Sequence, residues 1–139
     1  MNQKYNIIVM NGTVDKLIAM ATIVSGAVAM GKEVTLFVTF WGLMAFKKGA
    51  WQDPAQQKLP AEYAEFAPMM TEAMQKHGVA PWMQTLRTAK ELGEVKVYAC
   101  SMTKDLFGME LEHLEDVVDG EKGVAGFIAD SEGAEVLVF

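Results

Sequence analysis

The strongest constraint on the fold lies at the start of the chain, where two short apolar runs flank one long segment with an apolar face. Residues 5–10 read Tyr-Asn-Ile-Ile-Val-Met, and residues 33–39 read Glu-Val-Thr-Leu-Phe-Val-Thr. Runs that are apolar on both faces are typical of strands buried in a parallel sheet. Residues 14–30 repeat apolar side chains at helical spacing and stop at Gly31, a frequent helix end. The pattern predicts two parallel strands joined by a right-handed helical crossover.

The remainder of the chain continues this alternation of strands and helices. Strands are predicted at residues 94–100, at Val117-Val118 and at residues 135–139, with helices at 102–107 and 124–131. Such alternation indicates a mostly parallel sheet covered by helices. We therefore expect an α/β fold, a three-layer α/β/α sandwich around a mostly parallel five-stranded sheet.

Prolines and glycines break the middle of the chain into shorter pieces. Helices are predicted there at residues 43–48, 61–77 and 81–92, the second of them interrupted near Pro68. Four methionines also cluster in this region: Met69, Met70, Met74 and Met83.

Methionine side chains suit both gaps in a core and adaptable binding surfaces. We interpret the chain as a single domain over residues 1–139, in which residues from about 43–93 form a Met-rich helical insertion. Residues 49–80 within it are expected to form either a lid over a site or an oligomer interface.

Charge and hydropathy narrow the classes of partner. The chain has 12 basic and 18 acidic residues, a formal net charge of −6, and an acidic surface repels nucleic acid. The two long apolar stretches, Leu17–Met30 and Val34–Phe46, are shorter than the roughly 18–20 residues that a membrane-spanning helix needs. The first residues lack the pattern of a signal peptide. We expect no membrane span, no nucleic-acid partner and a cytoplasmic location, where a lone thiol stays reduced.

The chain has one cysteine, Cys100, and two histidines. These counts exclude an internal disulfide, a Cys-x-x-Cys dithiol and a zinc ribbon. Glu112, His113 and Asp116 stand at helical spacing, but three mixed ligands are more typical of a solvated charged face than of a metal site. No metal and no cofactor is expected.

The cysteine falls where a parallel sheet places its ligands, at the carboxyl ends of the strands. Cys100 ends the strand predicted at 94–100, and Ser101 is the candidate cap of the next helix. Amide groups at a helix start lower the pKa of a thiol and favour the reactive thiolate. Lys104, one turn further, would add positive potential, and Asp105 beside it would oppose that effect.

The exits of the first two strands complete the expected substrate or anion pocket. Their candidate residues are Asn11, Gly12, Thr13, Thr39, Trp41 and Gly42. The simpler interpretation of the first exit is a turn followed by a helix cap, and that of Trp41 is packing in the core. A nucleotide or flavin domain is a further alternative, although the first exit has a single glycine where a phosphate loop has several.

The chemistry open to this thiol is restricted by its neighbours. Leu106 occupies the position of the arginine in a Cys-x5-Arg phosphatase loop, and Val97 that of the threonine in a peroxidatic motif. His77 lies in an irregular stretch and His113 in a charged one, so no histidine base is evident. Reversible transfer of sulfane sulfur, carried as a persulfide on the thiolate, needs neither a metal nor a general base.

Three segments resemble the DsrE/DsrF-like sulfur-relay family, especially the branch often labelled peroxiredoxin-like. Residues 97–109, Val-Tyr-Ala-Cys-Ser-Met-Thr-Lys-Asp-Leu-Phe-Gly-Met, are similar to the family's cysteine segment. The Gly-Thr-x-Asp-Lys-Leu turn within residues 5–31 and the Thr-Phe-Trp-Gly-Leu run at 39–43 are similar to its first two strand exits. The match covers nearly the whole chain and is weakest over residues 49–80.

The resemblance implies a sulfur carrier or sulfurtransferase in which Cys100 holds the persulfide. It also implies a homo-oligomer, a trimer or hexamer, and a small TusA-like protein that donates or accepts sulfur. The alternative from another class is a non-catalytic oligomerising or small-ligand-binding α/β module, in which Cys100 is an inert buried side chain.

Overall fold

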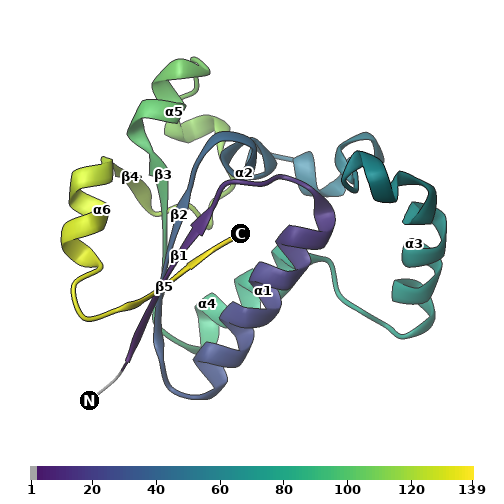
Figure 1. The fold of residues 1–139 in the computed structure, drawn as a ribbon, viewed down its shortest axis with the longest axis horizontal. Helices are drawn as coiled ribbons and strands as arrows, with labels where there is room; N and C mark the ends of the chain where they lie inside the picture. The colour runs from purple at the N-terminus through teal and green to yellow at the C-terminus, as the bar shows by residue number, and fades with distance from the viewer. Residues whose placement is uncertain (1–2) are drawn as a thin grey trace.

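The computed structural model describes residues 3–139 and is built on a five-stranded sheet in which all neighbouring strands are parallel (Figure 1). The strand order is β4-β3-β2-β1-β5. The strands are β1 (Lys4–Val9), β2 (Glu33–Val38), β3 (Val95–Cys100), β4 (Gly120–Lys122) and β5 (Glu135–Val138). The expected α/β fold with a parallel five-stranded sheet is confirmed.

Six α-helices connect and cover these strands: α1 (Val14–Ala29), α2 (Phe40–Ala45), α3 (Ala67–Lys76), α4 (Trp82–Leu92), α5 (Ser101–Leu106) and α6 (Val124–Asp130). Short 3-10 helices lie at Ala50–Gln52, Pro54–Gln56, Ala61–Phe66 and Leu111–His113. Among residues 3–139, no helix is both long enough and apolar enough to cross a membrane.

The two faces of the sheet are covered very unequally. Helices α1 and α4 pack side by side on one face, and the much shorter α6 lies on the other (Figure 1). The first face holds the main core, in which Leu36, Val97 and Met20 are fully buried. The second face holds a small cluster around Phe37 and Phe127. Because side chains alternate along a strand, the parity of each residue decides which of these two environments it enters.

The fourth strand lies three residues later than predicted. Val117 is buried in the main core, while the backbone of Asp119 donates to the Val97 carbonyl oxygen at 2.8 Å. The Asp119 side chain accepts from the Val97 amide at 2.8 Å. These contacts lead the chain to the sheet edge, so that Gly120–Lys122 pairs with β3 instead of Val117-Val118.

The helices of the Met-rich stretch also differ from the prediction. The helix expected at 43–48 begins earlier, as α2, because Phe40 adopts a φ of 47° directly after β2 and turns the chain. The helix expected at 61–77 divides into a 3-10 helix and then α3, which has Pro68 in its first turn. None of the residues of α3 is buried, and the helix stands away from the sheet (Figure 1).

The close approach of α2 to β1 generates a stability prediction. A Cβ at Gly42 would lie 2.1 Å from the Val9 carbonyl oxygen, so Gly42→Ala should destabilise the fold by about 1–3 kcal/mol. Gly26→Ala is the matched control because nothing lies within 4 Å of that position in α1, and it should stabilise by roughly 0.5–1 kcal/mol. Urea denaturation measures both changes, and a Gly42→Ala variant as stable as the parent would contradict the close approach.

Candidate functional site

Cys100 is the last residue of β3 and directly precedes α5, so it occupies the N-cap position predicted for Ser101. Its side chain is 1 % exposed and points to the second face of the sheet, where it clusters with Phe37 and Phe127. Ser101 instead forms the first turn of α5 and is half-buried. The only thiol of the chain is therefore at the expected strand exit and is covered.

A buried pair of hydroxyls joins the exit of β2 to α5 beside this thiol. Val38 pairs with Ala99 in the ladder, which places Thr39 next to Cys100. The Oγ1 atoms of Thr39 and Thr103 are 2.7 Å apart, and these residues are 7 % and 0 % exposed. Phe40 follows with its strained positive φ, and its amide donates to Thr103 Oγ1 at 3.4 Å. Thr103 thus ties the strained turn to the helix that begins at the cysteine.

The pKa of Cys100 reflects two opposing causes. Burial raises the pKa of the thiol because a thiolate loses hydration. Hydrogen bonds to the sulfur from the Thr103 and Met102 amides, and from one hydroxyl of the Thr39–Thr103 pair, lower it. The hydrogen bonds prevail, so the pKa lies below the ordinary value of a cysteine. The thiolate is therefore favoured despite its burial.

Lys104 does not supply the positive potential predicted for it. Its ammonium group lies 3.1 Å from Asp105 Oδ1 and 3.2 Å from Glu121 Oε2, and the residue is 7 % exposed. Hydrogen bonds to these two carboxylates raise the pKa of Lys104. Its charge is neutralised by acidic neighbours, and the shift of the Cys100 pKa comes from hydrogen bonds instead.

A different lysine, Lys122, lies opposite Cys100 on the neighbouring strand. Cys100 pairs with Lys122 in the register of β3 and β4. The Lys122 ammonium lies 4.1 Å from the ring centroid of Tyr98, which is on the same sheet face as Cys100, and forms an ion pair with Asp130 of α6. This ion pair lowers the pKa of Asp130. Sequence reasoning missed Lys122 because it placed the fourth strand too early, and it missed Thr103, for which the sequence held no clear signal because the predicted helix cap was Ser101 in place of Cys100.

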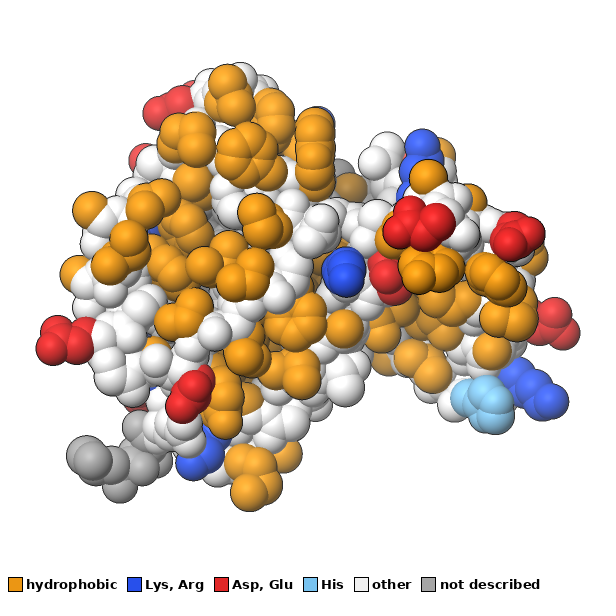
Figure 2. Space-filling model, in the orientation of Figure 1, with side chains coloured by type: hydrophobic (Ala, Val, Ile, Leu, Met, Phe, Trp, Pro, Cys, Tyr) orange, Lys and Arg blue, Asp and Glu red, His pale blue; other side chains and the backbone are white. Residues whose placement is uncertain are grey.

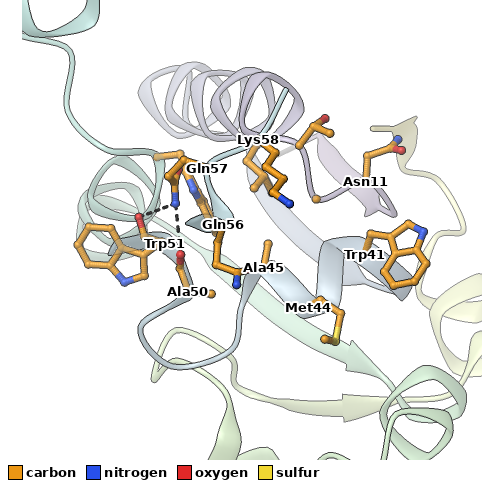
Figure 3. Close-up of a pocket in the computed structure, with 13 residues that line it drawn as sticks. Asn11, Trp41, Met44, Ala45, Ala50, Trp51, Gln56, Gln57 and Lys58 are labelled. Atoms are coloured by element: carbon orange, nitrogen blue, oxygen red, sulfur yellow. Dashed lines mark hydrogen bonds between the residues drawn. The ribbon is translucent and has the colours of Figure 1, made fainter. Parts of the chain in front are cut away.

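All but one of the remaining predicted pocket residues lie elsewhere, around a cavity of about 280 Å³ on the side of the sheet that α1 covers (Figure 3). Four predicted residues line it: Asn11, Gly12, Thr13 and Trp41. Met44, Trp51 and Lys58 add two apolar walls and an ammonium group. Cys100 is not among its lining residues, so the predicted pocket divides into a buried thiol site and a separate cavity.

Hydrogen bonds to backbone carbonyl oxygens hold the walls of the cavity in place. The Lys58 carbonyl oxygen accepts from the Val14 amide at 2.8 Å and fixes the start of α1. Gln57 donates to the Ala50 and Trp51 carbonyl oxygens at 3.2 and 2.8 Å (Figure 3). Gly42 does not line the cavity; it packs against Val9.

Two of the three residues weighed as metal ligands, His113 and Asp116, have other partners. His113 Nδ1 accepts from the Glu110 amide at 2.9 Å, and Asp116 pairs with Arg87 at 3.1 Å. Over residues 3–139, no group of three or more histidine, cysteine or acidic side chains is arranged to hold a metal ion.

Comparison with known proteins identifies the family of the chain. The sequence model of the DsrE/DsrF/DrsH-like family matches residues 1–139. The chain belongs to this family. It is 34 % identical to the uncharacterized protein YrkE of Bacillus subtilis, covering 99 % of this chain and 96 % of YrkE. It is 29 % identical to the sulfur carrier protein DsrE2 of Allochromatium vinosum, covering 99 % of this chain and 98 % of DsrE2.

Solved structures share the fold at low sequence identity. The protein of unknown function MTH1491 from Methanobacterium thermoautotrophicum superposes with a TM-score of 0.61 at 13 % identity, over 99 % of this chain and 100 % of that one. The ychN protein of E. coli superposes with a TM-score of 0.59 at 18 % identity, over the full length of both chains.

The hydrogen bonds at the sulfur predict a shift that can be titrated. Thr103→Val removes one hydroxyl donor to the thiolate and should raise the pKa of Cys100, whereas Thr103→Ser should leave it close to the parent value. The ultraviolet absorbance of the thiolate against pH, with Cys100→Ser as the blank, measures the shift. A Thr103→Val titration that coincides with the parent would show that the hydroxyl does not stabilise the thiolate.

Proposed function

We propose that this protein is a sulfur carrier or sulfurtransferase that holds sulfane sulfur as a persulfide on Cys100 and passes it to a partner thiol. The observation that supports this most is the only thiol of the chain, placed at a strand-to-helix junction beside the buried Thr39–Thr103 hydroxyl pair and the first amides of α5, which favour its thiolate. Membership of the DsrE/DsrF/DrsH-like family adds support, as does the relative named as a sulfur carrier.

The proposed transfer consists of two exchange reactions. The Cys100 thiolate attacks the terminal sulfur of a donor persulfide, R–S–SH, forming a new S–S bond as the old one breaks and R–S⁻ leaves. An acceptor thiolate then attacks the terminal sulfur of the Cys100 persulfide and regenerates the Cys100 thiolate. Each step moves one sulfur atom with no net oxidation or reduction, so the pair of reactions requires no redox cofactor.

The cysteine count makes the second step intermolecular. With one cysteine in the chain, no internal thiol is available to resolve the persulfide as a disulfide. The proposed donor or acceptor is therefore a separate protein, a TusA-like sulfur carrier, and the proposed site of the exchange is the cytoplasm.

Exposed apolar side chains lie on the elements at the Cys100 side of the sheet and are suited to protein contacts. They occupy α5, α6 and β5, and Figure 2 shows hydrophobic side chains gathered over this part of the surface. The most exposed are Met102, Leu106, Val124, Ile128, Val136 and Val138. Apolar patches of this kind mark interaction sites, in accord with a homo-oligomer, a trimer or hexamer, and with a docking partner.

A second candidate function is favoured by one observation, the 1 % exposure of Cys100. A non-catalytic oligomerising or ligand-binding module would keep the thiol as a small apolar side chain. The two functions differ in thiol reactivity: a carrier alkylates near neutral pH in the folded state, whereas an inert thiol reacts only after denaturation.

Mass spectrometry after incubation with a persulfidated donor protein tests the proposed function. We expect the intact mass to increase by that of one sulfur atom, the increase to map to Cys100, and a reductant to remove it. Cys100→Ser is the control and should gain no mass. Absence of the adduct from the parent, or its persistence in Cys100→Ser, would contradict the proposal.

A further inference from the structure

Helix α6 covers the face of the sheet that carries Cys100 and is docked there by one apolar side chain. Phe127 is 4 % exposed and is the only buried residue of α6. Its ring stacks on Phe37 with centroids 4.6 Å apart and planes at 17°. Val124 and Ile128 on the same helix are 51 % and 65 % exposed. Little apolar surface therefore holds α6 on the sheet.

The remaining attachments of α6 are polar: an ion pair at the surface and two hydrogen bonds from Asn6, which is 0 % exposed. Lys122 forms its ion pair with Asp130, whose side chain is 45 % exposed. Asn6 donates to the Asp130 carbonyl oxygen at 3.3 Å and to the Ser131 hydroxyl at 2.9 Å. An ion pair that reaches solvent contributes little to stability, and the hydrogen bonds from buried Asn6 hold only the C-terminal end of the helix, at Asp130 and Ser131.

The helices on the other face of the sheet bury more side chains than α6 does. Helix α1 buries six of its residues against the main core, and α4 buries four. Proteins open locally where few apolar contacts are buried, at a lower free energy than global unfolding. Of the helices lying on the two faces of the sheet, α6 is the one that can separate most readily in a subunit whose Val124 and Ile128 no partner covers.

Separation of α6 would change two things at the thiol together. It would remove Phe127 from the cluster that contains Cys100. It would also take Asp130 away from Lys122, which remains beside Cys100 because β3 and β4 hold both residues in register. The closed state thus pairs this cation with Asp130, and the open state would leave it unpaired on the strand next to Cys100.

We propose that α6 is a gate over Cys100, latched by the Lys122–Asp130 ion pair, whose opening exposes the thiol and frees Lys122 to attract an anionic sulfur donor. This inference rests on the proposed function, since it describes how the same site is regulated. It assigns a positioning role to Lys122 and a gating role to Phe127.

Alkylation of the folded protein by neutral iodoacetamide tests the gate, because the single thiol gives a single reaction. Asp130→Asn should increase the rate about 2- to 5-fold, as expected for loss of a solvent-exposed ion pair. Phe127→Ala should increase it about tenfold or more, since it removes the one buried side chain of α6. Glu132→Gln is the matched control, because it removes an exposed carboxylate next to α6 that has no ion pair or side-chain hydrogen bond to any of residues 3–139, and it should leave the rate unchanged.

The charge of the reagent tests the role of Lys122. Iodoacetate carries a negative charge, so its rate relative to iodoacetamide reports the potential at the thiol. Asp130→Asn should raise this ratio because it frees Lys122. Lys122→Gln should also speed the reaction with iodoacetamide, because it breaks the latch, but it should lower the ratio.

Three results would overturn the gate. One is equal iodoacetamide rates in Asp130→Asn, Phe127→Ala, Glu132→Gln and the parent. Another is a parent rate equal to that of the urea-unfolded chain. The third needs no variant: native-state hydrogen exchange should show less protection for the amides of α6 than for those of β3, and equal protection would refute local opening. None of these assays contains a sulfur donor, so failure of the gate is distinguishable from absence of a persulfide adduct.

Discussion

The parallel backbone pairing of β1, β2 and β3 is the constraint on which the rest of the structure depends. It brings three strand exits to one edge and sets Thr39 beside Cys100. The buried hydrogen bond between the Thr39 and Thr103 hydroxyls then connects the two exits. A one-residue slip in this register would move Cys100 to the other sheet face, away from the hydroxyls that favour its thiolate.

Much of this arrangement could be predicted from the sequence. Apolar runs with β-branched residues identified the four longer strands, and the alternation with helices identified the parallel sheet. The position of Cys100 at a strand exit followed from the same pattern. The short β4 could not be found in this way, because Gly-Glu-Lys contains no apolar residue and pairs only as an edge strand. Lys122 lies in β4, so its place opposite Cys100 could not be predicted either.

The separation of the predicted pocket into two parts has a simple geometric cause. Val97 and Ala99 point into the main core that α1 covers, whereas Tyr98 and Cys100 point to the opposite face. The turn that leads into α1 must leave the sheet toward the face that α1 covers. Grouping residues by strand exit alone ignores this parity, which the alternation of Val95, Lys96, Val97 and Tyr98 already contained.

The burial of Cys100 also bears on its survival in an oxidising cell. A thiolate with a lowered pKa is the form that peroxides convert to sulfenic acid, and further oxidation to sulfinic and sulfonic acids destroys it as a nucleophile. This chain has no second cysteine that could rescue the sulfenic acid as an internal disulfide. The stacked rings of Phe37 and Phe127 therefore shield the site chemically, because a thiol that peroxide rarely meets keeps its capacity for exchange.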